Sequence, residues 1–187
     1  MHKTSAQYDS IITTCRQVFE KKNLDYGTSW RIMRLSSIID QIYIKAARIR
    51  TIEEKGSMKI DEGIGSEFMG IVNYCIMGMI QMELKDESEI ELEAKQVLTM
   101  YDKYVHETKN LMEQKNHDYG EAWRDMLLST YTDMLLMRIH RIRQIMDNKG
   151  KTIASEGIAS NLMDMINYSL FALIRMSEDA TDAQMRK

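Results

Sequence analysis

Residues 115–123 read Lys-Asn-His-Asp-Tyr-Gly-Glu-Ala-Trp, and residues 22–30 read Lys-Asn-Leu-Asp-Tyr-Gly-Thr-Ser-Trp. Both stretches share a Lys-Asn-x-Asp-Tyr-Gly-x-x-Trp pattern, and the copies lie 93 positions apart. The similarity continues downstream at this offset, which grows to 94 after one inserted residue. The matched pairs are Asp40 with Asp133, Lys45 with Arg138, Arg48 with Arg141, Arg50 with Arg143, Glu62 with Glu156 and Asn73 with Asn167. A period this long indicates a duplicated domain rather than a solenoid.

The duplication divides the chain into two repeats, residues 1–85 and 86–187, each small for an independent core. Apolar residues recur at helical spacing, and no stretch alternates long enough to be a strand. The sequence therefore predicts an all-α fold in which two three-helix repeats pack as a pseudo-twofold helical bundle. Helices are expected over residues 6–22, from a cap at Ser36–Ser37 to Lys55, and over 66–84, 88–115, 130–148 and 160–177, with a frayed end at 178–187. The early glutamates of the helix over 88–115 favour a helix N-terminus. This helix is expected to run unbroken and to serve both as the linker and as the first helix of repeat 2.

Composition excludes several classes of protein. A net charge of −3 argues against broad electrostatic binding to nucleic acid. No apolar run reaches the roughly 18 residues of a membrane span, and the polar start does not resemble a signal peptide, so a cytoplasmic location is expected. Cys15 and Cys75 have no cysteine at the matched positions, which predicts free, buried thiols and no zinc site.

The Asp-Tyr-Gly turn recurs in both repeats and has two interpretations. It can be a helix stop, in which glycine closes the helix, Trp30 and Trp123 anchor the packing, and Thr28 or Ser29 caps the next turn. A stop alone does not explain why a lysine, an aspartate and a tyrosine recur in fixed order. Exposed polar residues of this kind are typical of binding sites, so a binding role is the alternative.

The middle helix of each repeat carries matched basic residues. Arg48 and Arg50 are about 200° apart around a helix, so both cannot lie on one solvent-facing stripe. We expect at least one of them to point into a groove between helices, where a guanidinium favours an anion such as a phosphate. The alternative is a solvated helix face with local ion pairs.

The last helix carries the most unusual side chain. Asp164 lies in an apolar helix, where a carboxylate is costly unless it is paired or bound to a metal. Asn167 lies one turn away and can face the same ligand. Glu156 lies about 12 Å from Asp164 along a continuous helix, so the two can share a metal ion only if the chain bends between them; the alternative is an acid at the helix start. Gly70 stands at the matched position of repeat 1, so that repeat is expected to lack the equivalent ligand. The substitution Asp164→Asn is expected to cost little stability.

The repeated motif, followed by the basic residues and then Glu-Gly-Ile and Asn-Tyr, resembles the nucleotide-modification-associated domain 1 family over nearly the whole chain. The helix order is more distantly similar to MazG-type all-α nucleoside triphosphate pyrophosphohydrolases, although their paired Glu-x-x-Glu motifs are not present in that form. The resemblance implies a protein that handles nucleotides. The motif residues carried over by position are Asp118, Tyr119, Gly120, Arg141, Glu156, Asp164 and Asn167, with Asp25, Tyr26, Gly27, Arg48, Glu62 and Asn73 in repeat 1. The residues predicted to bind a nucleotide are Lys115, Asp118, Tyr119, Arg138, Arg141 and Asn167, together with Lys22, Asp25, Tyr26, Arg48 and Asn73.

Three functions follow as hypotheses. The first is a pyrophosphohydrolase-like enzyme that cleaves a nucleoside triphosphate, with Mg²⁺ as cofactor and Asp164, Glu156 and Asp133 as metal ligands. The second is a nucleotide-binding module without catalysis, and the third is a helical scaffold. Close grouping of the three acids favours catalysis, whereas dispersed acids beside a basic cleft favour binding alone. Nucleotide is the expected ligand, no membrane or nucleic-acid partner is indicated, and a homodimer is a further candidate assembly.

Overall fold

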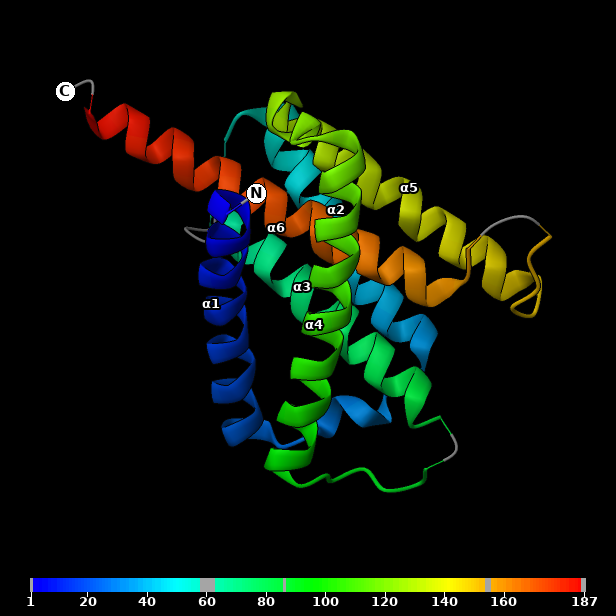
Figure 1. Cartoon of the computed structure of the whole chain (residues 1–187). Helices are drawn as coiled ribbons and strands as arrows, with labels where there is room; N and C mark the ends of the chain where they lie inside the picture. Colours follow the sequence, from blue (N-terminus) through cyan, green and yellow to red (C-terminus); the bar gives the residue numbers. More distant parts are fainter. Residues whose placement is uncertain (1, 58–62, 86, 154–155, 186–187) are drawn as a thin grey trace.

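A computed structural model describes residues 2–57, 63–85, 87–153 and 156–185, and these residues form helices and connecting segments without a strand. Figure 1 shows the helices packed as a bundle, with the C-terminal part of the last helix projecting from it. The elements are α1 (His2–Tyr26), η1 (Ser29–Ile32), α2 (Leu35–Lys55), α3 (Ile64–Glu83), α4 (Ala94–Tyr119), η2 (Ala122–Asp125), α5 (Leu128–Asp147) and α6 (Ile158–Met185). The predicted all-α fold is confirmed.

The core is built around α3 and α6, which pack against each other (Figure 1). The α2 helix covers α3, α5 covers α6, and α2 also contacts α5. The predicted apolar stripe of α2 is buried at Ile38, Ile42, Ala46 and Ile49, while Ile52 at its end is half-buried. Each fully buried isoleucine contributes about 1.5–3 kcal/mol relative to an exposed one. Helical spacing therefore identified this part of the core correctly.

The first helix of each repeat packs partly on the other repeat, since α1 contacts α6 and α4 contacts α3. Tyr8 on α1 donates a hydrogen bond of 3.1 Å to Oδ1 of Asn167 on α6. Its match, Tyr101 on α4, donates one of 2.9 Å to Oδ1 of Asn73 on α3. These reciprocal contacts are those expected of two repeats related by an approximate twofold axis, and that axis itself stays a prediction.

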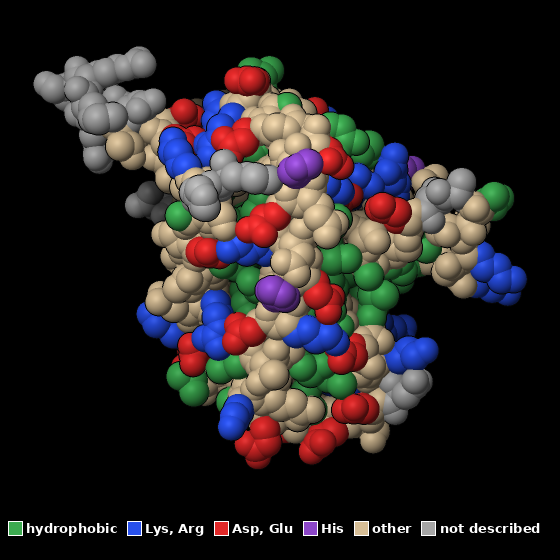
Figure 2. Space-filling view, in the orientation of Figure 1, with side chains coloured by type: hydrophobic (Ala, Val, Ile, Leu, Met, Phe, Trp, Pro, Cys, Tyr) green, Lys and Arg blue, Asp and Glu red, His purple; other side chains and the backbone are tan. Residues whose placement is uncertain are grey.

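A second reciprocal contact joins α2 and α5 at the surface. Arg50 lies 3.0 Å from the carboxylate of Asp133, and its match Arg143 lies 2.8 Å from Asp40. All four side chains are about half exposed, so each pair contributes at most about 1 kcal/mol. Figure 2 shows acidic and basic side chains interspersed on the visible face, as such pairing requires.

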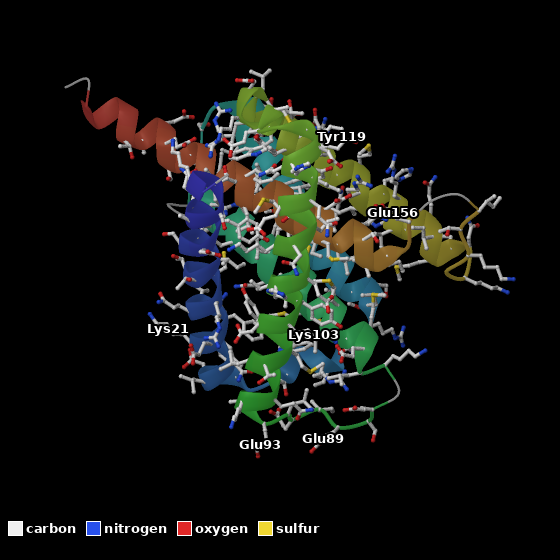
Figure 3. The ribbon with its side chains drawn as sticks, in the orientation of Figure 1. Lys21, Glu89, Glu93, Lys103, Tyr119 and Glu156 are labelled. Carbon is white, nitrogen blue, oxygen red and sulfur yellow. The ribbon has the colours of Figure 1, made fainter. Side chains whose placement is uncertain are left out.

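The helix predicted over residues 88–115 begins later than expected, because α4 starts at Ala94. The residues before it form a nonhelical segment, along which Figure 3 labels Glu89 and Glu93. Side chains from far upstream form hydrogen bonds with its backbone carbonyls. Thr28 donates to the carbonyl of Ile90, and Arg31 donates to those of Glu87 and Glu89. These tertiary hydrogen bonds replace the ones a helix would make.

Two predicted helix ends also differ. No side-chain hydrogen bond caps η1 or α2, which begin after Thr28 and Arg34, so the predicted serine and threonine caps are wrong. The predicted fraying after residue 177 is wrong as well, because α6 continues to Met185. Glu178, at the beginning of this extension, forms ion pairs of 2.9 Å with Arg124 and 3.0 Å with Lys3.

The predicted turn after the first helix is confirmed, since α1 ends at Tyr26 and Gly27 has a φ of 58°, a conformation that favours glycine. Cys15 and Cys75 are free and buried, as expected. Within the described ranges, no helix combines the length and apolar character needed to cross a bilayer.

Candidate functional site in the second repeat

Asp164 lies inside the bundle, on the part of α6 that faces α4 and α5. Its side chain is only 3% exposed, yet two cations from neighbouring helices reach it. Lys115 Nζ on α4 lies 2.6 Å from Oδ1, and a terminal nitrogen of Arg138 on α5 lies 2.7 Å from Oδ2. The contact between Arg138 and Oδ2 is an ion pair without hydrogen-bond geometry, so Oδ2 has no hydrogen-bond donor among the described residues. The cost of burying this carboxylate is thus offset chiefly by ion pairing.

Arg138 is held on several sides. Asn161 Oδ1 accepts a hydrogen bond of 3.2 Å from it, and the Tyr168 hydroxyl accepts one of 3.5 Å. Desolvation opposes its charge, but Tyr168 and the Asp164 carboxylate outweigh that effect and raise the pKa of Arg138 above its ordinary value. The guanidinium is therefore fixed in position and permanently charged.

An open pocket of about 1040 Å³ lies beside this ion pair. It lies between the C-terminal end of α4, the second half of α5, the following loop and the start of α6. Five residues predicted from the sequence line it: Lys115, Arg138, Arg141, Glu156 and Asp164. Figure 3 places the labelled Glu156 beside the start of α6. The remaining lining residues are Gln144, Ile145, Asp147, Asn148, Lys151, Thr152, Ile153 and Asn161.

Arg141 and Lys151 are the exposed cations of this pocket. Within the described part of the chain, neither has a hydrogen-bond or ion-pair partner. Arg141 lies one turn beyond Arg138 on α5, so both guanidinium groups lie on the same side of that helix. An anion entering the pocket would meet Arg138, which Asp164 already neutralises, and Arg141, which has no anionic partner among the described residues.

Repeat 1 has a buried carboxylate of its own. Glu67 on α3 is 8% exposed, and it forms an ion pair of 3.1 Å with Lys45 and a second with Arg48. Gly70 itself supplies no acid, and the expectation that repeat 1 lacks an equivalent metal ligand stays a prediction. The acid lies one helical turn earlier, where it faces the same helix that carries the matched cations. Glu62, the match of Glu156, lies outside the described residues.

Several predicted nucleotide-binding residues lie elsewhere. Asn73 and Asn167 are buried and bond to the tyrosines of the opposite repeat, and they also donate to backbone carbonyls of Cys15 and Thr108. Their amides hold the helices together. None of the lysine, aspartate and tyrosine of the first-repeat motif lines the pocket; these are Lys22, Asp25 and Tyr26.

The second-repeat motif is divided between two surfaces. Lys115 enters the pocket, whereas Asp118 and Tyr119 at the end of α4 are exposed outside its lining. Asp118 lies 3.1 Å from His117, and Tyr119 is 77% exposed (Figure 3). The glycine after them ends α4 with a φ of 64°. Asp118 and Tyr119 thus mark a helix end, and their role in binding a nucleotide stays a prediction.

The three predicted metal ligands do not form a metal site. Among the described residues, no group of three His, Cys, Asp or Glu side chains is close enough to hold an ion. Asp133 pairs with Arg50 on the α2–α5 surface, and Asp164 is already neutralised by two cations. A divalent ion would have to displace both cations, so these residues do not fit Mg²⁺, and a Mg²⁺ requirement stays a prediction.

Sequence reasoning missed the amides and the lysine that complete the pocket, namely Gln144, Asn148, Lys151 and Asn161. They were missed because the search relied on residues shared by both repeats, and the first repeat has different side chains there. Glu67 carries the signal that identified Asp164, an acid within an apolar helix. It was set aside as a metal ligand because it lies on a different side of the predicted helix from Glu62 and Asn73.

Fold and pocket together define an all-helical protein of two repeats, with a cationic pocket in the second. The family model of nucleotide modification associated domain 1 matches residues 22–82 and again residues 115–176. The chain therefore belongs to that family and contains the domain twice, as the sequence motifs predicted. A search of curated proteins and a search of solved structures each find no match, and the similarity to MazG-type enzymes stays a prediction.

Proposed function

We propose that the pocket between α4, α5 and α6 binds a nucleotide through its phosphate groups. The observation that carries this proposal is the exposed Arg141, which lines the pocket beside the Lys115–Asp164–Arg138 cluster and has no ion-pair partner among the described residues. A guanidinium in this setting favours an oxyanion with two acceptor oxygens, as a phosphate provides. The family description supports a ligand of the nucleotide class.

Asp164 acts as a positioning residue in this proposal. Its carboxylate holds Lys115 and Arg138 at the pocket wall, and these two cations offset the repulsion between that carboxylate and an arriving phosphate. Holding the two long side chains in place before binding reduces the entropy lost when the ligand arrives. The pocket volume, about 1040 Å³, lies at the upper end of the usual range for small-molecule sites.

The α5 helix also suggests an orientation for the ligand. Arg138, Arg141, Ile145 and Asn148 follow one another at spacings of three or four residues, so they share a face. Asn148 lies about 15 Å from Arg138 along the helix axis, a span suited to an extended nucleotide. Phosphates would bind at the arginine end, and the base would meet the amides and the fully exposed Ile153 at the other end.

Binding, rather than hydrolysis, is the activity proposed. Dispersed acids beside a basic cleft are the arrangement that distinguishes a binding protein from a metal-dependent pyrophosphohydrolase. The pocket does contain two further carboxylates, on Asp147 and Glu156. In this proposal they repel phosphate groups from their part of the pocket, which favours binding with the phosphates toward Arg141.

Calorimetric titration with a panel of ribo- and deoxyribonucleoside triphosphates, with and without Mg²⁺, tests the proposal. Arg141→Ala should weaken binding at least tenfold, because a charge-assisted hydrogen bond contributes about 1.5–3 kcal/mol. Arg34→Ala is the matched control, because this substitution removes the same charge from an exposed residue outside the pocket. Equal losses in the two variants, or no binding to the parent protein, would overturn the proposal. Release of pyrophosphate or phosphate in the same mixtures would show hydrolysis instead.

A further inference from the structure

The two repeats place their buried acids one helical turn apart. Between α2 and α5 the offset is 93, so Lys45 matches Arg138 and Arg48 matches Arg141. Between α3 and α6 the offset is 94, so that Glu67 matches Asn161 and Gly70 matches Asp164. Each repeat thus has one acid and one neutral residue at the same two positions, in opposite order. This exchange changes which cations the acid neutralises.

In repeat 1 the acid occupies both cations of the middle helix. One carboxylate oxygen of Glu67 lies 3.1 Å from Lys45 Nζ, and the other contacts Arg48. The side chain of Lys45 extends across Gly70, because a Cβ added to this glycine would lie 2.7 Å from Cε of the lysine. The absence of a side chain at Gly70 therefore allows Lys45 to reach Glu67.

In repeat 2 the acid neutralises a different pair of cations. Asp164 lies one turn further along its helix, where it pairs with Arg138 and with Lys115 of α4. Asn161 stands at the position of Glu67, and its neutral amide accepts a hydrogen bond from Arg138. Arg141, the match of Arg48, has no carboxylate partner among the described residues and lines the pocket.

We propose that Glu67 takes the place of a bound phosphate in repeat 1, so that the chain binds one phosphate-bearing ligand, in repeat 2, rather than two. The inference deepens the proposed function, on which its stoichiometry rests. A carboxylate presents two oxygens to Lys45 and Arg48 much as a phosphate does. Because this internal anion is part of the chain, it competes with any free anion at a high effective concentration. Repeat 1 then serves as the structural partner of the binding repeat.

Titration with inorganic pyrophosphate tests the stoichiometry. The parent protein should bind one equivalent. The double variant Glu67→Asn/Gly70→Asp copies the order found in repeat 2, moves the acid by one turn, and should bind two. Adding Arg48→Ala to the double variant should return the stoichiometry to one. Circular dichroism and thermal melting establish that each variant is folded.

Glu67→Gln provides a second route if the double variant does not fold, because it removes the charge and keeps the shape. It should also bind two equivalents. Two equivalents bound by the parent protein, or one bound by the folded variants, would overturn the inference while leaving the proposed function in place. No binding by the parent but one equivalent bound by the variants would overturn the proposed function and support the role of Glu67. No binding by any of them would overturn both.

Discussion

Tyr101 donates a hydrogen bond of 2.9 Å to the side-chain carbonyl oxygen of Asn73, and the two residues belong to different repeats. Both are buried, and burial raises the pKa of the Tyr101 hydroxyl well above its ordinary value, so it remains a donor at any ordinary pH. The same amide donates to the backbone of Cys15. One asparagine therefore ties α3 to α4 and to α1.

Tyr101→Phe should lower the free energy of unfolding by about 1–2 kcal/mol, because it leaves the Asn73 carbonyl oxygen buried without its donor. Tyr26→Phe is the control, since Tyr26 is 68% exposed and should change stability by less than about 0.5 kcal/mol. Urea denaturation measures both. Indistinguishable midpoints for the two variants would show that the buried hydrogen bond contributes nothing net.

Asp164→Asn should destabilise the protein by about 2–3 kcal/mol, at or below the lower end for a broken buried ion pair, because Lys115 is half exposed. The structure thus reverses the expectation, drawn from sequence, that this change costs little: Arg138 would lose its anionic partner. Asp133→Asn removes an equal charge from an exposed pair and should cost less than about 1 kcal/mol. Equal stability of the two variants, measured in urea, would contradict this ranking.

Gly120→Ala should destabilise the protein by about 1–3 kcal/mol, although nothing lies within 4 Å of the added carbon. The cost comes from the backbone, whose φ of 64° and ψ of −154° are nearly restricted to glycine. Gly63→Ala is the control, because Gly63 is equally open but has a φ of −61°. Thermal melts that rank Gly63→Ala as the more damaging change would rule this explanation out.

Acid should loosen the contact between α1, η2 and α6. Partial burial tends to raise the pKa of Glu178, but hydrogen bonds from Gln7 and Lys3 and the charge of Arg124 outweigh it, so this pKa is lowered. An acid with a lowered pKa stabilises the fold above its ordinary value, 4.5, and loses that contribution as the pH falls through its folded-state value. Glu178→Gln should therefore reduce the fall in stability between about pH 5 and pH 3.

Urea midpoints measured across this pH range test the assignment to Glu178. Glu107→Gln is the control, since Glu107 is exposed on α4 and has no ion pair among the described residues. Its pH profile should match that of the parent. A Glu178→Gln profile that also matches the parent would mean that another carboxylate governs acid sensitivity.

Much of the fold was predictable because the buried face of a helix shows in the spacing of its apolar residues. The stripe from Ile38 to Ile49 follows from helical spacing, and the end of α1 follows from the left-handed conformation that Gly27 can adopt. The segment before Ala94 was not predictable, since its glutamates favour a helix locally while Thr28 and Arg31, about 60 positions earlier, bind its backbone. In this segment, tertiary hydrogen bonds outweighed the local preference for a helix.

The candidate site was predictable where the repeats carry matched cations and where one side chain is unusual for its helix. Matched cations led to Arg138 and Arg141, and an acid in an apolar helix led to Asp164. Glu67 was compared only with residues of its own helix, whereas its partners lie on α2. Side chains that meet across helices leave no spacing pattern within one helix.

The exchange of hydrogen bonds between Tyr8 and Asn167 and between Tyr101 and Asn73 constrains how such a chain can originate. A polypeptide with one repeat would carry both the donor and the acceptor, and two identical chains could satisfy both groups by exchanging these hydrogen bonds. In a pair of identical chains every substitution is present in both copies. Two copies within one chain can differ, and the acids at Glu67 and Asp164, one helical turn apart in the two repeats, are such a difference.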